Sequence, residues 1–224
     1  MTPHAASTGT QTLREPEPGA GALITLEGVE GCGKSTQAKK LAAHLRRDGY
    51  RVVETREPGG TRFAERIRNL VLNASKEPIA PECEAHLICA SRSQHVARVI
   101  RPALQQGAVV LCDRFSDSTV AYQGYGRGLP LDGLMYLNRF ATGRVVPDLT
   151  LLLDLPVATG LARRRRGLHQ NRLDREAHAF YQRVRNGYLE LAERYPRRIK
   201  VINATPDPQT VAAAIEKIVT RFLK

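Results

Sequence analysis

Short continuous runs of apolar residues recur along the chain, and segments with helical periodicity separate them. The runs predict buried strands near residues 23–27, 51–55, 108–112, 149–153 and 199–202. Continuously apolar strands that alternate with helices are typical of a parallel sheet with helices on both faces. We therefore expect an α/β fold built on a five-stranded parallel sheet flanked by helices.

The segments between these runs predict the helices. Their apolar periodicity places helices near residues 36–45, 61–73, 81–106, 116–124, 131–143, from 157 into an arginine cluster, 175–194, and after Pro208. Thr61 is expected to cap the second of these helices at its N-terminus. Pro102 is expected to bend the last turns of the long helix at 81–106, because proline lacks the backbone N–H group that a helix interior needs.

The ends of the chain and its composition limit the class of protein. Residues 1–20 have no periodicity and predict a disordered tail, whereas residues 21–224 suit a single domain. No apolar run approaches the roughly 20 residues that span a bilayer, and the first 20 residues lack the apolar block of a signal peptide. The four cysteines form no C-x-x-C pair, which favours reduced thiols. We expect a cytoplasmic protein without a membrane partner.

One stretch carries a specific chemical signal. The sequence from Gly28 to Ser35 has the form G-x-x-x-x-G-K-S between a predicted strand and a predicted helix, which is the phosphate-binding P-loop. Backbone N–H groups and the helix N-terminus would receive phosphate oxygens, Lys34 would reach the terminal phosphates, and Ser35 would bind Mg²⁺. We expect ATP phosphates to contact the following residues: Gly28, Val29, Glu30, Gly31, Cys32, Gly33, Lys34, Ser35 and Thr36.

Two apolar strands end in an aspartate, so Asp113 and Asp154 both qualify for the second magnesium-holding position of such sites. We favour Asp113, which would hold the ion directly or through water, because Arg114 follows at once and supplies positive charge for an anion. Asp154 precedes Pro156 and is more typical of the end of a strand.

The charges inside and beyond the P-loop point to a second substrate. Glu30 would be repelled by phosphates, so its side chain is expected to turn away and hydrogen-bond a hydroxyl of another ligand; exposure to solvent is the alternative. The loop supplies only one positive side chain, Lys34, whereas phosphoryl transfer needs more. The run of arginines from 163 to 166, followed by a polar segment, predicts a mobile lid at about 163–175 that adds this charge. A solvated basic helix end is the alternative.

The formal net charge of +12 raises the question of nucleic-acid binding. The arginines are spread over several helices and strand ends, which suits two small anionic substrates better than a continuous nucleic-acid surface. A regulatory GTPase or a nucleic-acid-binding ATPase therefore remains a weaker alternative, and no Asn-Lys-x-Asp guanine-reading segment is present. We expect no nucleic-acid partner.

Residues 22–224 resemble the bacterial thymidylate kinases, a family of P-loop nucleoside monophosphate kinases. The resemblance rests on segments in a fixed order: residues 27–36, Arg56-Glu57-Pro58-Gly59-Gly60-Thr61, 92–96, 113–124 and 147–150. The acidic P-loop residue and the arginine-bearing lid match a recognised subtype. The resemblance implies transfer of the γ-phosphate of ATP to dTMP in dTTP biosynthesis, with Mg²⁺, in a homodimer packed through helices. Another nucleoside monophosphate or deoxynucleoside kinase is the nearest alternative.

The resemblance also implies roles for individual residues. Arg68, Arg114 and Glu57 would surround the acceptor phosphate, Arg92 would hydrogen-bond the pyrimidine, and Thr119 and Gln123 would line the base pocket. Tyr122 would pack under the deoxyribose, and Glu30 would hold the 3′-hydroxyl. The implied catalytic residues are Lys34, Arg114, Arg163 and Arg166.

Ile88 departs from the family pattern, in which a phenylalanine stacks on thymine. Base–aromatic stacking is worth about 1–3 kcal/mol, so we expect weaker base binding or looser selectivity here. Ile88→Phe should lower the dissociation constant of dTMP by about fivefold or more in equilibrium titrations. Unchanged affinity and base preference would mean that Ile88 serves packing alone.

Overall fold

The computed structural model describes residues 21–73, 77–165, 172 and 176–224. The five strands are β1 (Ala22–Glu27), β2 (Val52–Arg56), β3 (Val109–Asp113), β4 (Leu149–Asp154) and β5 (Ile199–Asn203). They pair in parallel in the order β2-β3-β1-β4-β5, which confirms the predicted sheet. The order switches direction at β1, and open parallel sheets bind ligands at such a point, beyond the carboxyl ends of the strands. The predicted tail, residues 1–20, lies outside the described residues.

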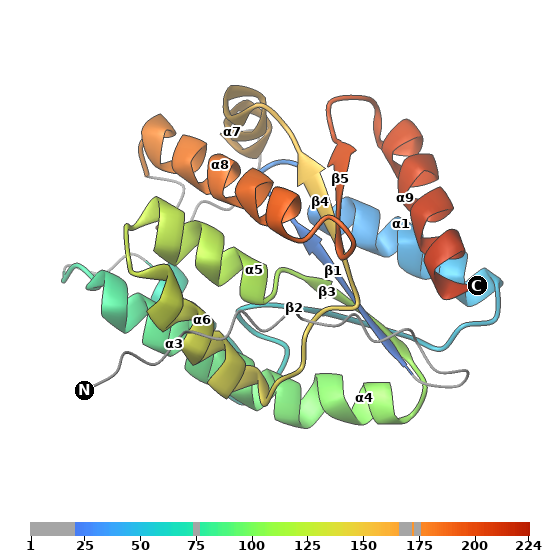
Figure 1. Ribbon diagram of the computed structural model, residues 1–224, viewed down its shortest axis with the longest axis horizontal. Coiled ribbons are helices and arrows are strands. Elements are labelled where there is room, and N and C mark those ends of the chain that lie inside the picture. Colours follow the sequence, from blue (N-terminus) through green and yellow to red (C-terminus); the bar gives the residue numbers. More distant parts are fainter. Residues whose placement is uncertain (1–20, 74–76, 166–171, 173–175) are drawn as a thin grey trace, which may run out of the picture.

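Alternate residues of the buried strands face different helical layers. Ile24, Leu26, Leu111 and Leu151 pack with α1 (Lys34–Arg47) and α9 (Pro208–Leu223). Leu23, Val110 and Cys112 face a second layer on the opposite side of the sheet, and so does Leu152. Figure 1 shows α1 and α9 side by side on one side, with α3 to α6 and α8 on the other. These two covered faces explain why the inner strands β1, β3 and β4 are mostly apolar.

The second layer contains the remaining helices. Its elements are α2 (Arg62–Leu72), α3 (Pro81–His95), α4 (Arg101–Gln105), α5 (Ser116–Thr119), α6 (Leu131–Thr142), α7 (Val157–Arg165) and α8 (His178–Arg194). Thr61 caps α2 as predicted, because its Oγ1 accepts a hydrogen bond from Ala64 N at 3.1 Å.

Two of the predicted helices contain π-helical turns. The expected helix at 81–106 consists of α3, a π-helical turn η1 (Val96–Ile100) and α4, with Pro102 in the first turn of α4. The expected helix at 116–124 is α5 followed by a second π-helical turn, η2 (Val120–Gly126). Pro102 lacks the N–H group that would donate to the preceding turn, and the π-helical turn lies directly before α4, which contains it; the helix continues past the proline to Gln105.

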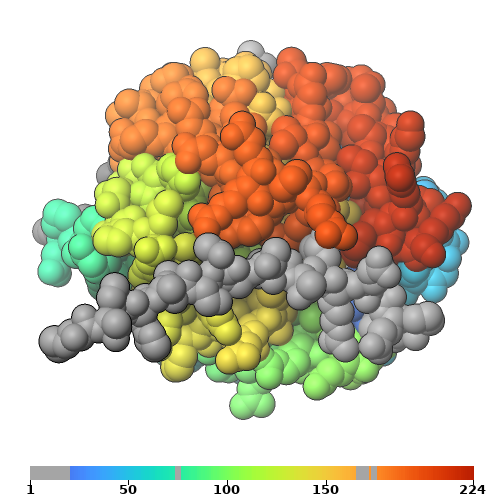
Figure 2. All heavy atoms as spheres, in the orientation of Figure 1, coloured from blue at the N-terminus to red at the C-terminus, as the bar shows by residue number. Residues whose placement is uncertain are grey.

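The C-terminal third of the chain completes the shell around β4 and β5. In the space-filling view, the orange and red atoms of α8, α9 and their connection form much of the face turned toward the reader (Figure 2). Residues of α8 such as Tyr181 and Val184 are fully buried beneath this surface. Among the described residues, no helix is long and apolar enough to cross a membrane. All four cysteines lie in the described part of the chain and are free thiols.

Candidate functional site

The P-loop connects β1 to α1 and depends on glycine at several positions. Gly28, Gly31 and Gly33 have φ angles of 138°, 73° and 98°, in the region that favours glycine. A Cβ atom on Gly31 would lie 2.0 Å from the carbonyl oxygen of Gly160. The close approach of these two glycines lets α7 pack directly against the phosphate-binding loop.

Lys34 is folded into the loop that it serves. Its ammonium group donates hydrogen bonds to the carbonyl oxygens of Gly28 at 3.1 Å and Val29 at 3.0 Å, and the side chain is buried. Ser35 and Thr36, by contrast, are exposed at the start of α1. The loop therefore presents its hydroxyls outward while protein carbonyls hold its only cation.

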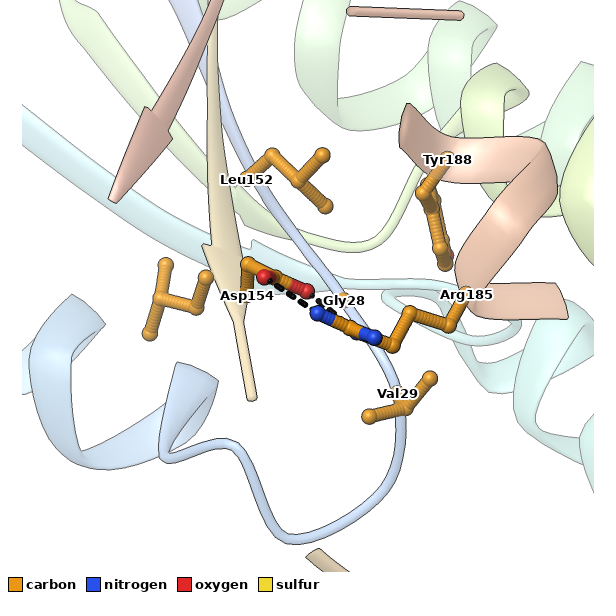
Figure 3. A pocket seen from close by; sticks show the side chains of 7 residues that line it. Gly28, Val29, Leu152, Asp154, Arg185 and Tyr188 are labelled. Carbon is orange, nitrogen blue, oxygen red and sulfur yellow. Dashed lines mark hydrogen bonds and ion pairs between the residues drawn. The ribbon is translucent and has the colours of Figure 1, made fainter. Parts of the chain in front are cut away.

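The two candidate aspartates have different partners. Asp113 Oδ2 accepts a hydrogen bond from Ser35 Oγ at 2.6 Å, so the end of β3 and the P-loop are in direct contact. Asp154 instead binds Arg185 of α8 through two hydrogen bonds of 2.7 and 2.8 Å. Figure 3 shows this ion pair beside Gly28 and Val29 of the loop. The geometry favours Asp113 for a role toward a metal and a supporting role for Asp154.

The Ser35–Asp113 pair fits Mg²⁺ chemically. Both side chains present oxygen atoms, and Mg²⁺ is usually bound by one or two protein oxygens together with water and substrate phosphates. Within the described parts of the chain, no group of three or more His, Cys, Asp or Glu side chains gathers that could hold a metal by itself. A magnesium ion here would depend on water and the nucleotide for most of its ligands.

Arg114 is the most highly connected side chain of the site. Its φ angle of 71° is unusual for a residue other than glycine, and its backbone N–H donates to Leu26 O at 3.0 Å. The guanidinium group donates to Gly28 O at 3.1 Å and to Glu30 Oε1 at 2.8 Å. It also lies 4.8 Å from the ring centre of Tyr122. A strained backbone held by so many contacts is typical of functional positions.

The carboxylate of Glu30 binds Arg114. Burial alone would raise the pKa of its carboxyl group, but the cations Arg114, Lys34 and Arg164 outweigh that effect and lower the pKa to about 2. Its partners are the guanidinium group of Arg114 at 2.8 Å and the hydroxyl of Tyr122 at 3.4 Å.

Arg68 adds a second cation near Arg114. It extends from α2 and donates to Pro58 O at 2.8 Å. Burial and the nearby charges of Arg56 and Arg114 together lower its pKa, while Glu65 acts in the opposite direction. Two positively charged guanidinium groups that repel each other are both stabilised by an anion bound between them.

Arg92 is buried and bound on several sides. Its Nε donates to Glu57 at 2.6 Å, and its two terminal nitrogens donate to Thr119 at 2.9 Å, to Asn138, and to the carbonyl oxygen of Phe115 at 3.1 Å. The other oxygen of Glu57 lies 3.0 Å from Nδ1 of His95. Both oxygens of Glu57 thus have protein partners, so this carboxylate is held as the counter-ion of Arg92. Four of the five N–H groups of Arg92 are engaged among the described residues, which leaves one for a ligand carbonyl.

The remaining expected base-site residues line the same region. Gln123 is buried and donates to Glu84 Oε1 at 2.7 Å, and Glu84 also binds Arg172. Tyr122 is buried beside Arg114. Ile88 lies on α3 and is only half-buried, as expected for a side chain that borders a binding site.

The arginine run divides at the end of α7. Arg163 lies on the helix, is exposed, and donates to the carbonyl oxygens of Ala204 and Thr205, both at 3.2 Å. Arg164 is the member of the run that acts on Glu30, lowering its pKa. Arg166 and most of the expected lid lie outside the described residues. The structure therefore brings Arg164, which the sequence did not single out, toward the P-loop, and it holds Arg163 against the β5–α9 connection.

Several residues of the site escaped prediction. Glu27, at the carboxyl end of β1, accepts hydrogen bonds from Ser118 and Tyr188 beneath Arg114. A charged residue at the end of an apolar strand is the signal that pointed to Asp113, and the same signal would have found Glu27. Tyr188, Asn138 and Glu84 carry no local pattern, because their partners are distant in the chain.

The fold and the site together define a P-loop nucleotide-binding protein. The thymidylate kinase family model matches residues 26–215. The thymidylate kinase of Trichlorobacter lovleyi is 50% identical over 203 residues, 88% of this chain and 96% of that protein. The Pseudomonas entomophila thymidylate kinase is 49% identical over 205 residues, 92% of this chain and 98% of that protein. The crystal structure of Ehrlichia chaffeensis thymidylate kinase is 34% identical, with a TM-score of 0.73 over 89% of this chain and 99% of that one. The chain belongs to the thymidylate kinase family.

The roles of Asp113 and Asp154 can be distinguished by the Mg²⁺ concentration that variants at each position require for activity. Asp113→Asn should raise the Mg²⁺ concentration that gives half-maximal phosphoryl transfer by about tenfold or more, because removal of a metal-orienting group costs about 10–100-fold in metal affinity. The matched variant Asp154→Asn should leave that concentration unchanged and lower the melting temperature slightly, since Arg185 loses half-exposed ion-pair contacts. An effect of Asp154→Asn on the Mg²⁺ requirement equal to that of Asp113→Asn would contradict this assignment.

Proposed function

We propose that residues 21–224 act as one kinase domain that transfers the γ-phosphate of ATP to dTMP, giving ADP and dTDP. Membership of the thymidylate kinase family supports the reaction class and both substrates. The observation that carries the proposal is the position of Arg114, which contacts both the P-loop and the side chains of the acceptor region. A single cation in that position can serve a phosphate of each substrate.

On the donor side, the P-loop from Gly28 to Thr36 would bind the ATP phosphates. Lys34 would exchange its contacts with Gly28 and Val29 for the terminal phosphates. Ser35 and Asp113 would hold Mg²⁺, which supplies charge neutralisation when it is bound with ATP. The exposure of the Ser35 side chain supports this arrangement, because its hydroxyl needs only to leave Asp113 to reach a ligand.

On the acceptor side, Arg114 and Arg68 would bind the phosphate of dTMP. The buried Arg92, held by Glu57, would offer its remaining N–H group to a pyrimidine carbonyl. Glu30 would accept a hydrogen bond from the 3′-hydroxyl. The remaining pocket residues are Ile88, Thr119 and Gln123 around the base and Tyr122 beneath the deoxyribose.

The chemistry is an in-line displacement. An oxygen of the acceptor phosphate forms a bond to the γ-phosphorus while the bond from that phosphorus to the bridging oxygen of ADP breaks. A phosphate monoester has its second pKa near 6 and is already largely a dianion at neutral pH, so no general base is needed. Lys34 and the arginines stabilise the charge that develops on the transferring group. Arg163 and Arg166 are proposed to approach the donor phosphates when a lid closes, and Arg164 is a third candidate because of its effect on Glu30.

The acceptor preference tests the function directly. ADP formation should be at least about tenfold more efficient, in kcat/KM, with dTMP than with dCMP, dGMP or AMP, because a site built to hydrogen-bond one base leaves buried polar groups unpaired with another. Lys34→Ala is the control that shows the activity belongs to this protein. Efficiency with dTMP no higher than with the other monophosphates would overturn the proposal.

We also propose that the enzyme acts in the cytoplasm as a homodimer. Large apolar side chains lie exposed on two helices that both pack against α3: Phe63 and Leu70 on α2, and Tyr136 and Phe140 on α6. Phe140 is 78% exposed, and exposed apolar side chains of this size suit contact with a second copy of the chain.

Light scattering coupled to gel filtration should give twice the mass of the chain. Phe140→Glu should reduce that mass to one chain without loss of helical circular dichroism, because a buried charge at the interface is costly. A wild-type protein that elutes with the mass of one chain at micromolar concentration would rule out the dimer.

A further inference from the structure

The mechanism proposed above does not use the buried carboxylate of Glu27. Glu27 is fully buried at the carboxyl end of β1, immediately before the P-loop. It accepts hydrogen bonds from the backbone N–H of Phe115 at 2.7 Å, from the hydroxyl of Ser118 at 2.5 Å and from the hydroxyl of Tyr188 at 2.8 Å. A charged group in such a place is costly unless it is hydrogen-bonded, and these three bonds offset part of that cost.

The two hydroxyl groups connect Glu27 to Arg114. One terminal nitrogen of Arg114 donates to Ser118 Oγ at 3.3 Å and to the oxygen of Tyr188 at 3.2 Å. Figure 3 shows Tyr188 extending from α8 toward the loop. The two hydroxyl oxygens lie 2.7 Å apart, so each hydroxyl proton points either at Glu27 or at the other hydroxyl. In either arrangement, oxygen lone pairs face the guanidinium group of Arg114.

We propose that Glu27 is a positioning residue, which turns the hydroxyls of Ser118 and Tyr188 into acceptors for Arg114 and thereby holds Arg114 in place for the acceptor phosphate. This inference rests on the proposed role of Arg114 in binding dTMP. Glu27 itself touches neither substrate. Its action passes through two neutral hydroxyls, which have no charge of their own to compete with a phosphate.

The surroundings of Glu27 make its charge sensitive to pH. Burial, followed by the nearby carboxylate of Asp117, raises its pKa from 4.5 to about 7, while Arg114, Ser118 and Tyr188 act in the opposite direction. Glu27 also interacts electrostatically with Arg92 of α3 and Arg198 before β5, and it helps to raise the pKa of the Cys112 thiol of β3. Glu27 is therefore ionised mainly above pH 7. Because its pKa is higher in the folded state than in the unfolded chain, Glu27 contributes most to the free energy of unfolding below pH 4.5. This contribution is lost as the pH rises through 7.

Glu27→Gln tests the role of the carboxylate with almost no change in shape. The amide oxygen can still accept from Phe115, but the amide nitrogen donates to the hydroxyls instead of accepting from them. At least one hydroxyl proton must then turn outward, toward the guanidinium group. The KM for dTMP at pH 8 should rise about tenfold, as expected for loss of a hydrogen bond to a charged group, and the KM for ATP should stay within about twofold.

The pH profile separates positioning from a merely structural role. A protonated Glu27 also donates to its neighbours, so the wild-type protein should resemble the variant at low pH. The ratio of the two KM values for dTMP should fall from about tenfold at pH 8 to near one at pH 6. Titration of the dTMP phosphate itself is common to both proteins and cancels in this ratio. The melting temperature of Glu27→Gln at pH 8 should not fall, because the variant removes a buried charge.

Thr25→Val is the matched control. Thr25 lies on the same strand, is equally buried, and hydrogen-bonds Thr150 Oγ1 at 2.8 Å. Its substitution should change neither KM.

Three results for Glu27→Gln would overturn the proposal. They are a ratio of KM values for dTMP that does not vary with pH, a rise in the KM for ATP equal to that for dTMP, and a KM for dTMP below that of the wild-type protein. If the wild-type protein phosphorylates dTMP and the variant shows one of these results, the inference about Glu27 fails and the proposed function stands. A wild-type protein without preference for dTMP would instead defeat the proposed function.

Discussion

The guanidinium group of Arg114 is the point at which the parts of the site are joined. It follows β3, donates to the P-loop carbonyl of Gly28, and contacts Tyr188 of α8 and Tyr122 of η2. Its left-handed backbone conformation costs energy, and the surrounding contacts hold it there. Burial would lower the pKa of this group, but Glu30 and the other neighbours raise it well above its usual value. Arg114 therefore remains charged under all conditions relevant to catalysis.

The cationic side chains that are proposed to bind phosphates already donate hydrogen bonds to oxygen atoms of the protein. Lys34 is held by two carbonyl oxygens of the loop, and Arg114 by the carboxylate of Glu30. Substrate binding in the proposed function is thus an exchange of partners, in which phosphates replace these acceptors and a sugar hydroxyl reaches Glu30. Such an exchange keeps the cations Lys34 and Arg114 bound to an acceptor before and after binding, which avoids the high cost of an isolated buried charge.

The sequence predicted the parts of this arrangement that depend on local patterns. The five strands, the P-loop and the cap at Thr61 follow from apolar runs, glycine spacing and the position of a threonine before a helix. The contacts of Glu27 with Tyr188 and of Arg92 with Asn138 did not, because they join residues far apart in the chain and depend on how α8 and α6 pack. The π-helical turn before Pro102 was missed for a related reason, since a proline alone does not reveal whether a helix bends or widens. The role expected of Arg163 was implied by the family resemblance. Because four arginines follow one another at 163–166, that resemblance does not fix which of them faces the P-loop.

The exchange at Arg114 is the central claim, and a crystal structure of the protein with dTMP and ADP tests it most directly. The account predicts the dTMP phosphate within hydrogen-bond distance of Arg114 and Arg68, with Glu30 released from Arg114 and bound to the 3′-hydroxyl. A bound dTMP whose phosphate lies away from both arginines, with the Glu30–Arg114 ion pair intact, would contradict it.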